Sequence, residues 1–135
     1  MVALLEKLVE WFYGIFFGVD RVVAPENGVR LVFVDGLFPS WAAAQTIGRT
    51  VFVKSYFLHF RGYQDELVWL LSHELVHVKQ WKKYGFLFAI LYPMASLLAL
   101  VRGKHYYRDN RFEREAEEEK FLHIKEASSM VSHIV

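Results

Sequence analysis

Apolar and polar positions along the chain predict a helix followed by two strands in the first half. From Leu4 to Ile15 apolar residues recur at helical spacing, which favours an amphipathic helix. After a turn at 24–28, the apolar runs 29–35 and 49–55 predict strands. The first of these runs is apolar on both faces, so we expect it in the interior of a sheet.

The second half of the chain is predicted to be helical. A long helix is expected over 66–83, with Gly85 suited to its C-terminal cap, and another over 86–101. A last helix opens at Asn110 and runs through an acidic stretch into 121–128.

Two stretches carry signals that interrupt regular structure. Residues 36–45 hold Pro39 and a run of alanines, so a short helix is expected there, ended by the break Thr46-Ile47-Gly48. Pro93 predicts a kink or a break in the apolar helix that contains it. The order helix, strand, strand, helix, helix, helix favours an α+β fold with a small mixed sheet.

The composition fits one globular domain over 1–135. The chain is 54% apolar and 23% charged, a balance that excludes intrinsic disorder. With 16 basic and 15 acidic residues, the net charge of +1 gives no indication of a nucleic-acid partner. The chain has no Cys, which fits a reducing compartment and leaves His, Asp and Glu as the available metal ligands.

Two apolar segments raise the question of membrane contact. Residues 3–19 have no positive cluster before them and no small-residue cleavage site after them, so they do not resemble a secretory signal. Their helix either caps the core or lies at a lipid headgroup boundary. Residues 84–101 form 18 uncharged positions, which on length alone is a transmembrane candidate. We expect a cytoplasmic protein, with peripheral membrane contact through either segment left open.

The chemistry of the chain is concentrated in the pattern H-E-x-x-H, which runs from His73 to His77. One helical turn separates the two histidines, so both imidazoles can meet one zinc ion. Glu74 projects beside them, within reach of a water on that ion, and is the candidate general base. The alternative is a pair of surface or core histidines.

A catalytic zinc site needs a third protein ligand, and the acidic run after Asn110 supplies the candidates. Glu113 and Glu117 share one helical face, so one can bind the metal while the other orients a ligand histidine. Spacing alone also leaves Glu115 as a candidate. Asn110 and Glu113 equally fit an N-cap and its reciprocating third residue, which requires no metal.

Residues 47–117 resemble the catalytic core of gluzincin metallopeptidases. The nearest group is the membrane-bound CAAX prenyl proteases and heat-shock proteases, with their small soluble relatives, the minigluzincins. The resemblance rests on a Gly-containing turn, a strand, an acidic pair before the zinc helix, the H-E-x-x-H motif and a distal F-E-x-x-A-D/E element: Gly48, Val51-Phe52-Val53-Lys54, Asp65-Glu66, His73 to His77 and Phe112 to Glu117. Residues 46–118 would then form the catalytic core, with 1–45 outside the resemblance and 119–135 a C-terminal helix and tail.

The resemblance implies a gluzincin-like fold and one Zn²⁺ per chain. It selects Glu113 as the third ligand beside His73 and His77, and it gives Glu117 a supporting place behind a ligand histidine. It also implies Glu74 as the catalytic residue that activates water. The expected function is therefore a zinc metalloendopeptidase.

The resemblance also implies how a peptide or protein substrate would bind. The strand that contains Val51, Phe52 and Val53 would be an edge strand above the zinc helix, and an extended substrate would add to it by main-chain hydrogen bonds. A group that polarises the oxyanion is expected as well, and the candidates are His105, Tyr106 and Tyr107.

The zinc site constrains the apolar segment 84–101. His77 and Glu113 must reach one ion from the same side of any membrane, and the 35 residues between them are too few for two crossings. A complete span is therefore excluded if the site is real. Burial is expected, and a groove or an interfacial or re-entrant element is the alternative.

Two other functions compete with the peptidase. One is a non-catalytic or latent zinc module, closed by a fourth ligand or by the tail 125–135 lying in the cleft. The other is a membrane-surface adaptor in which the H-E-x-x-H pattern is coincidental. No residue pattern indicates a particular oligomeric state, and His59, His123 and His133 are interpreted as surface or packing residues.

Overall fold

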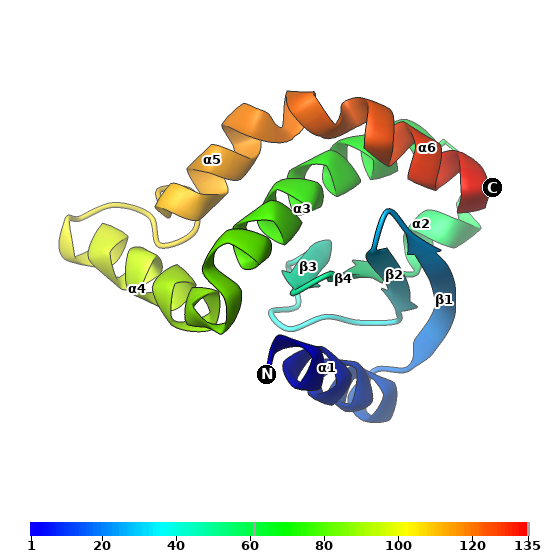
Figure 1. Ribbon diagram of the computed structural model, residues 1–135, viewed down its shortest axis with the longest axis horizontal. Helices are drawn as coiled ribbons and strands as arrows, with labels where there is room; N and C mark the ends of the chain where they lie inside the picture. The colour runs from blue at the N-terminus through cyan, green and yellow to red at the C-terminus, as the bar shows by residue number, and fades with distance from the viewer. Residues whose placement is uncertain (61, 135) are drawn as a thin grey trace.

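The computed structural model describes residues 1–60 and 62–134 and has the expected α+β architecture (Figure 1). The elements in chain order are α1 (Val2–Phe16), β1 (Val19–Glu26), β2 (Val29–Val34), β3 (Ala44–Ile47), β4 (Thr50–Lys54), α2 (Tyr56–His59), α3 (Gln64–Tyr84), α4 (Phe88–Val101), α5 (Arg111–Glu119) and α6 (Ile124–Ile134). Short 3₁₀ turns, Gly85–Leu87 and Lys120–His123, lead into α4 and α6.

The four strands form one mixed sheet in the order β1-β2-β4-β3. Strand β2 pairs with β1 in antiparallel and with β4 in parallel, so its interior position is confirmed. The prediction of β4 as the edge strand is wrong. Val51, Phe52 and Val53 are fully buried, and β4 pairs with β2 on one side and β3 on the other. The edge is β3.

The sequence pattern did not predict two of the strands, β1 and β3, for different reasons. Strand β1 contains charged residues and a proline, which weaken the apolar pattern. The observed turn after it is shorter than the predicted 24–28 and consists of Asn27 and Gly28, which both have positive φ. Strand β3 is only four residues long and half polar, so it gives little periodicity. Gly48, at φ +62°, turns it directly into β4. The short helix expected within 36–45 is absent from that described stretch.

Helix α3 crosses the sheet and confirms the predicted long helix. Its apolar face, Leu67, Leu71, Leu75 and Val78, is buried in one cluster with strand residues such as Phe33. Gly85, at φ +59°, ends the helix as expected. Beyond it, α4 continues through Pro93 without a break.

The C-terminal segment is neither frayed nor in the cleft. Helix α6 runs to Ile134 and buries Ala127, Met130 and Val131 in the cluster that α3 shares with the sheet. The alternative in which the tail 125–135 lies in the cleft is therefore not built into the described part of the chain, and Val135 lies outside the described residues.

The helical stretch Gln64–Val101 meets the length and hydropathy requirements of a membrane-crossing helix, a criterion that core helices of water-soluble proteins can also meet. Only 11% of its most apolar window is buried. Within α4 the buried residues are Phe88 and Ala99, so the burial expected for 84–101 holds for a small part of that segment.

Candidate metal centre

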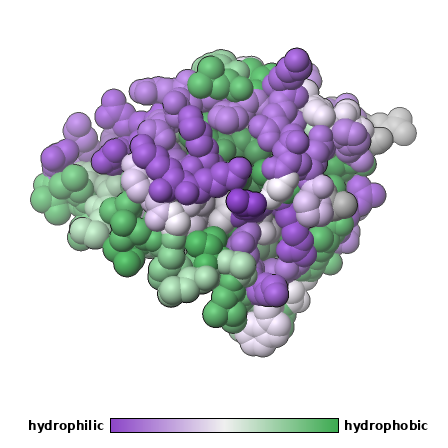
Figure 2. Space-filling model, in the orientation of Figure 1, coloured by the Kyte–Doolittle hydropathy of each residue, from purple (hydrophilic) through white to green (hydrophobic). Residues whose placement is uncertain are grey.

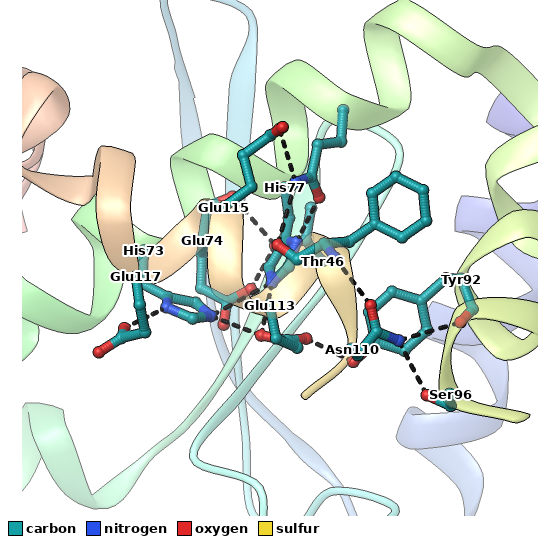
Figure 3. A network of polar contacts seen from close by, with 12 residues as sticks. Thr46, His73, Glu74, His77, Tyr92, Ser96, Asn110, Glu113, Glu115 and Glu117 are labelled. Atoms are coloured by element: carbon teal, nitrogen blue, oxygen red, sulfur yellow. Dashed lines mark hydrogen bonds and ion pairs between the residues drawn. The ribbon is translucent and has the colours of Figure 1, made fainter. Parts of the chain in front are cut away.

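Helices α3 and α5 face one another and bring the predicted ligands together (Figure 3). His73 and His77 stand one turn apart on α3, and Glu113 comes from the first turn of α5. Asn110 caps α5 through a hydrogen bond that its side chain accepts from the N–H of Phe112 at 2.8 Å. The cap is confirmed, but the carboxylate of Glu113 turns to the histidines.

Three potential ligand atoms converge at the centre. Nε2 of His73 lies 2.8 Å from Oε1 of Glu113, and Nε2 of His77 lies 3.0 Å from the same oxygen. The two Nε2 atoms are 3.2 Å apart. Ligand atoms of a tetrahedral zinc ion are separated by about 3.3 Å, given bonds of about 2.0 Å. The donor set therefore fits zinc with small displacements.

Hydrogen bonds behind the histidines orient both rings. Nε2 of Gln80 donates to the backbone oxygen of Phe112 at 3.1 Å and to Glu115 at 3.0 Å, which leaves its Oε1 to accept from Nδ1 of His77 at 2.8 Å. Nδ1 of His73 lies 2.7 Å from Oε2 of Glu117. With Nδ1 donating in each ring, Nε2 of the neutral imidazole presents its lone pair to the centre.

Lone pairs that face one another require a positive charge between them. Burial lowers the pKa of His77, but the hydrogen bond to Glu113 and the negative charges of Glu74 and Glu113 outweigh it and raise that pKa to about 9. The same balance raises the pKa of His73. Burial alone would raise the pKa of Glu113, yet the hydrogen bonds from His73 and His77 hold the pKa of this carboxyl well below its usual range. Protons supply the charge that a cation would supply.

Glu74 lies beside the centre on the strand side. Its ligand oxygen is within 4.8 Å of the ligand nitrogens of His73 and His77, in a group able to hold a metal. The carboxylate is buried and accepts a 2.6 Å hydrogen bond from Oγ1 of Thr46 on β3. This bond fixes the carboxylate between the histidines and the edge strand.

Helix α4 contributes a contact that the sequence interpretation missed. The Tyr92 hydroxyl donates to Oε2 of Glu113, and burial together with the Glu113 charge raises the pKa of Tyr92. The amide of Asn110 donates to the backbone oxygen of Tyr92 at 3.0 Å and to Ser96 at 2.8 Å, which ties α4 to α5. No periodicity distinguishes Tyr92 from its neighbours in the apolar run.

A cleft of about 1200 Å³ opens beside the centre. Its walls come from β3 and the loop before it, from α3 and α4, and from the loop that precedes α5. Trp41 and Tyr107 belong to opposite loops and meet edge to face, with ring centroids 4.9 Å apart. The site is thus reached through a largely apolar cleft.

The other predicted site residues divide between the cleft and the surface. Tyr106 and Tyr107 line the cleft, and burial with the charge of Glu113 raises the pKa of Tyr107. His105 does not line it; its Nδ1 accepts the N–H groups of Tyr107 and Arg108, each at 3.1 Å. The three lone histidines pair with acids away from the centre: His59 with Asp20, His123 with Glu126 and His133 with Glu26.

Comparison of the chain with family models, with curated proteins and with solved structures finds no match. The interpretation of the centre therefore rests on its own residues and on their geometry.

Proposed function

We propose that this protein is a zinc-dependent metallopeptidase of the gluzincin kind. The observation that carries the proposal is the convergence of His73 Nε2, His77 Nε2 and Glu113 Oε1 within 2.8–3.2 Å of one another. A buried carboxylate, Glu74, stands beside them at the wall of an open cleft. This is the donor set of a catalytic zinc site with three protein ligands.

In the proposed reaction, His73, His77 and Glu113 would hold the zinc, and Glu74 would act as the general base and then as the general acid. When bound there, zinc would supply Lewis acidity to a scissile carbonyl and would lower the pKa of a water molecule. Glu74 takes the proton of the attacking water and delivers it to the leaving amine. Thr46 holds the Glu74 carboxylate in place, because its hydroxyl donates to Oε2. Tyr107, which lines the cleft, is the proposed hydroxyl donor near the oxyanion.

The substrate in this proposal is an extended peptide that adds to β3. The N–H of Lys54 donates to the backbone oxygen of Ala43 at 3.1 Å, and antiparallel alternation then turns the backbone groups of Ala44 and Thr46 away from β4. Trp81 Nε1 donates to the oxygen of Thr46 at 3.0 Å from that side, so that oxygen already has a partner and the groups of Ala44 are the ones proposed to pair with the peptide. Since residues 42–47 line the cleft, a peptide there would lie between β3 and the centre.

The decisive experiment compares Glu74→Gln with the wild type for zinc content and for cleavage of an unstructured protein. Gln keeps the volume and polarity of Glu but cannot act as a base, so we expect full zinc content and a loss of activity of about 10²- to 10⁴-fold. Asp65→Asn is the matched control, because Asp65 is an exposed acid in the first turn of the same helix.

Two results would contradict the proposal. Equal cleavage by Glu74→Gln and the wild type assigns the activity to another mechanism or to a contaminant. Zinc bound with full occupancy and no cleavage by the wild type favours the non-catalytic zinc module instead. A cytoplasmic location is part of the proposal.

A further inference from the structure

The outer face of α1 has the opposite polarity from that of an ordinary surface helix. Its acids turn inward: Glu6 accepts from the N–H of Arg49 and the hydroxyl of Thr50, both at 2.8 Å, and Glu10 pairs with Arg30 at 2.7 and 2.9 Å. Apart from the exposed Lys7, the solvent side of the helix carries an apolar stripe whose members are each more than half exposed: Leu4, Leu8, Trp11 and Ile15. A helix that orders its acids inward and its apolar stripe outward is suited to an apolar environment.

Helix α4 presents a second apolar stripe. Its residues recur at helical spacing and are 46–76% exposed: Ile90, Met94, Leu97, Leu98 and Val101. The helix contains no charged residue. Between α4 and the start of α5 lies an apolar groove of about 370 Å³, with Arg111 among its lining residues.

The two stripes belong to one side of the molecule. Val2 and Leu5 of α1 pack against the same cluster as Phe88 and Ala89 of α4, so both helices adjoin one cluster near the start of α4. Figure 2 shows hydrophobic side chains gathered over the lower part of the molecule, where Figure 1 places α4 and α1. The surface over α5 and α6 is mainly hydrophilic.

Positive charge is concentrated in the part of the chain that contains α4. Residues 79–111 contain seven Lys or Arg and one Asp, a net charge of +6, whereas the rest of the chain carries a net −5. Exposed cations flank α4 at both ends, Lys82 and Lys83 before it and Arg102 and Lys104 after it. Two copies of so basic a region would repel each other across an interface. An anionic surface would attract it.

Helix α4 by itself is too short to cross a bilayer. The 14 residues of α4 span about 21 Å, which is less than the hydrocarbon core of a bilayer at about 30 Å. His77 precedes α4 and Glu113 follows it, and Nε2 of His77 lies 3.0 Å from Oε1 of Glu113. Both ends of α4 must therefore lie on the same side of any membrane.

We propose that α1 and α4 together dock this protein on the surface of an anionic phospholipid bilayer. The apolar stripes enter the boundary between headgroups and acyl chains, and the cations around α4 meet the lipid phosphates. The proposal is independent of the peptidase activity, because none of the metal-centre residues belongs to either stripe.

The test is co-sedimentation of the full chain with vesicles of phosphatidylglycerol and phosphatidylcholine in equal parts, and with vesicles of phosphatidylcholine alone. We expect strong binding to the anionic vesicles that weakens as salt is added, and much weaker binding to the neutral ones. Replacing Met94 and Leu97 together by Gln should weaken binding at least about tenfold. Lys82→Gln and Lys83→Gln should each weaken it about fivefold.

Leu122→Gln is the matched control, because Leu122 is 73% exposed and lies outside both stripes. Circular dichroism verifies that each variant folds. Absence of binding to anionic vesicles, or an equal loss in Leu122→Gln and in the Met94 and Leu97 variant, overturns the proposal. It is also overturned if the lipid-free protein forms a dimer that this double variant abolishes, because the surface then belongs to a second copy.

Discussion

The candidate metal centre and the apolar surface of α1 and α4 contrast in how the fold treats their side chains. At the centre, polar groups are buried and matched; among the described residues no fully buried side-chain nitrogen or oxygen lacks a hydrogen-bond partner. On the surface, large side chains such as Trp11, at 65% exposure, contact solvent. Protonation of the two histidines, whose pKa values are raised, balances the charge of Glu113 in the first region, whereas the second has no contact that covers its apolar side chains among the described residues.

The difference teaches which experiments can separate the two regions. Three facing lone pairs at His73, His77 and Glu113 respond to pH and to cations, because protonation supplies the charge that holds them together. The apolar stripes contain no group that titrates, so they respond to lipid and to detergent. A change that affects one region should leave the other unaltered.

The largest stability effect that we expect is a pH dependence of the metal-free protein. The folded pKa of His77, about 9, lies above the ordinary value of 6.5. The stabilisation is therefore fully present below about pH 6.5 and is lost as the pH rises through about 9. Urea unfolding of the metal-free chain should show a loss of about 3 kcal/mol between pH 6.5 and 9.5.

Zinc-loaded protein is the control for this experiment. The metal takes the place of the protons, so the pH dependence over the same range should shrink. A metal-free protein whose stability is flat between pH 6.5 and 9.5 would show that the two histidines do not share a proton with Glu113.

A smaller effect is expected from the residue behind His77. Replacing Gln80 by Leu removes the acceptor of the Nδ1–H group and should weaken zinc binding about 10- to 100-fold, because that acceptor fixes the ring. Competition with a chromophoric chelator measures the affinity. Glu115→Gln is the matched control: Glu115 contacts the Gln80 amide, and among the described contacts it makes none with His77. An equal loss in both variants would assign the effect to packing of α5.

Much of the centre was predictable because helical spacing is a local property. The i,i+4 positions of His73 and His77 place both rings on one face wherever the helix packs. Helical spacing did not settle the third ligand, since it left Glu115 and Glu117 as candidates beside Glu113, and the resemblance to gluzincins selected Glu113. In the structure Glu113 meets both histidines, Glu117 orients His73, and Glu115 bonds to Gln80.

The sheet was less predictable because strand order depends on pairing between distant residues. The apolar run of β4 was interpreted as an edge strand, but apolar residues on both faces are typical of an interior strand, and β4 is one. The true edge, β3, is short and contains Gln45 and Thr46, so its pattern was too weak to be recognised. The correction of the edge strand from β4 to β3 matters, because the peptide is proposed to bind at the edge strand and its site therefore moves to β3.

The smallest effect is expected on the apolar surface, where a substitution should leave stability almost unchanged. Leu97 is 60% exposed, so Leu97→Gln in lipid-free buffer should change the free energy of unfolding by no more than about 0.5 kcal/mol. Leu71→Ala, in the buried cluster beneath α3, is the positive control and should destabilise the protein clearly. Chemical denaturation measures both. A loss above about 1 kcal/mol in Leu97→Gln would mean that this face is already packed against another molecule in solution, since a leucine that is 60% exposed has little packing within the chain to lose.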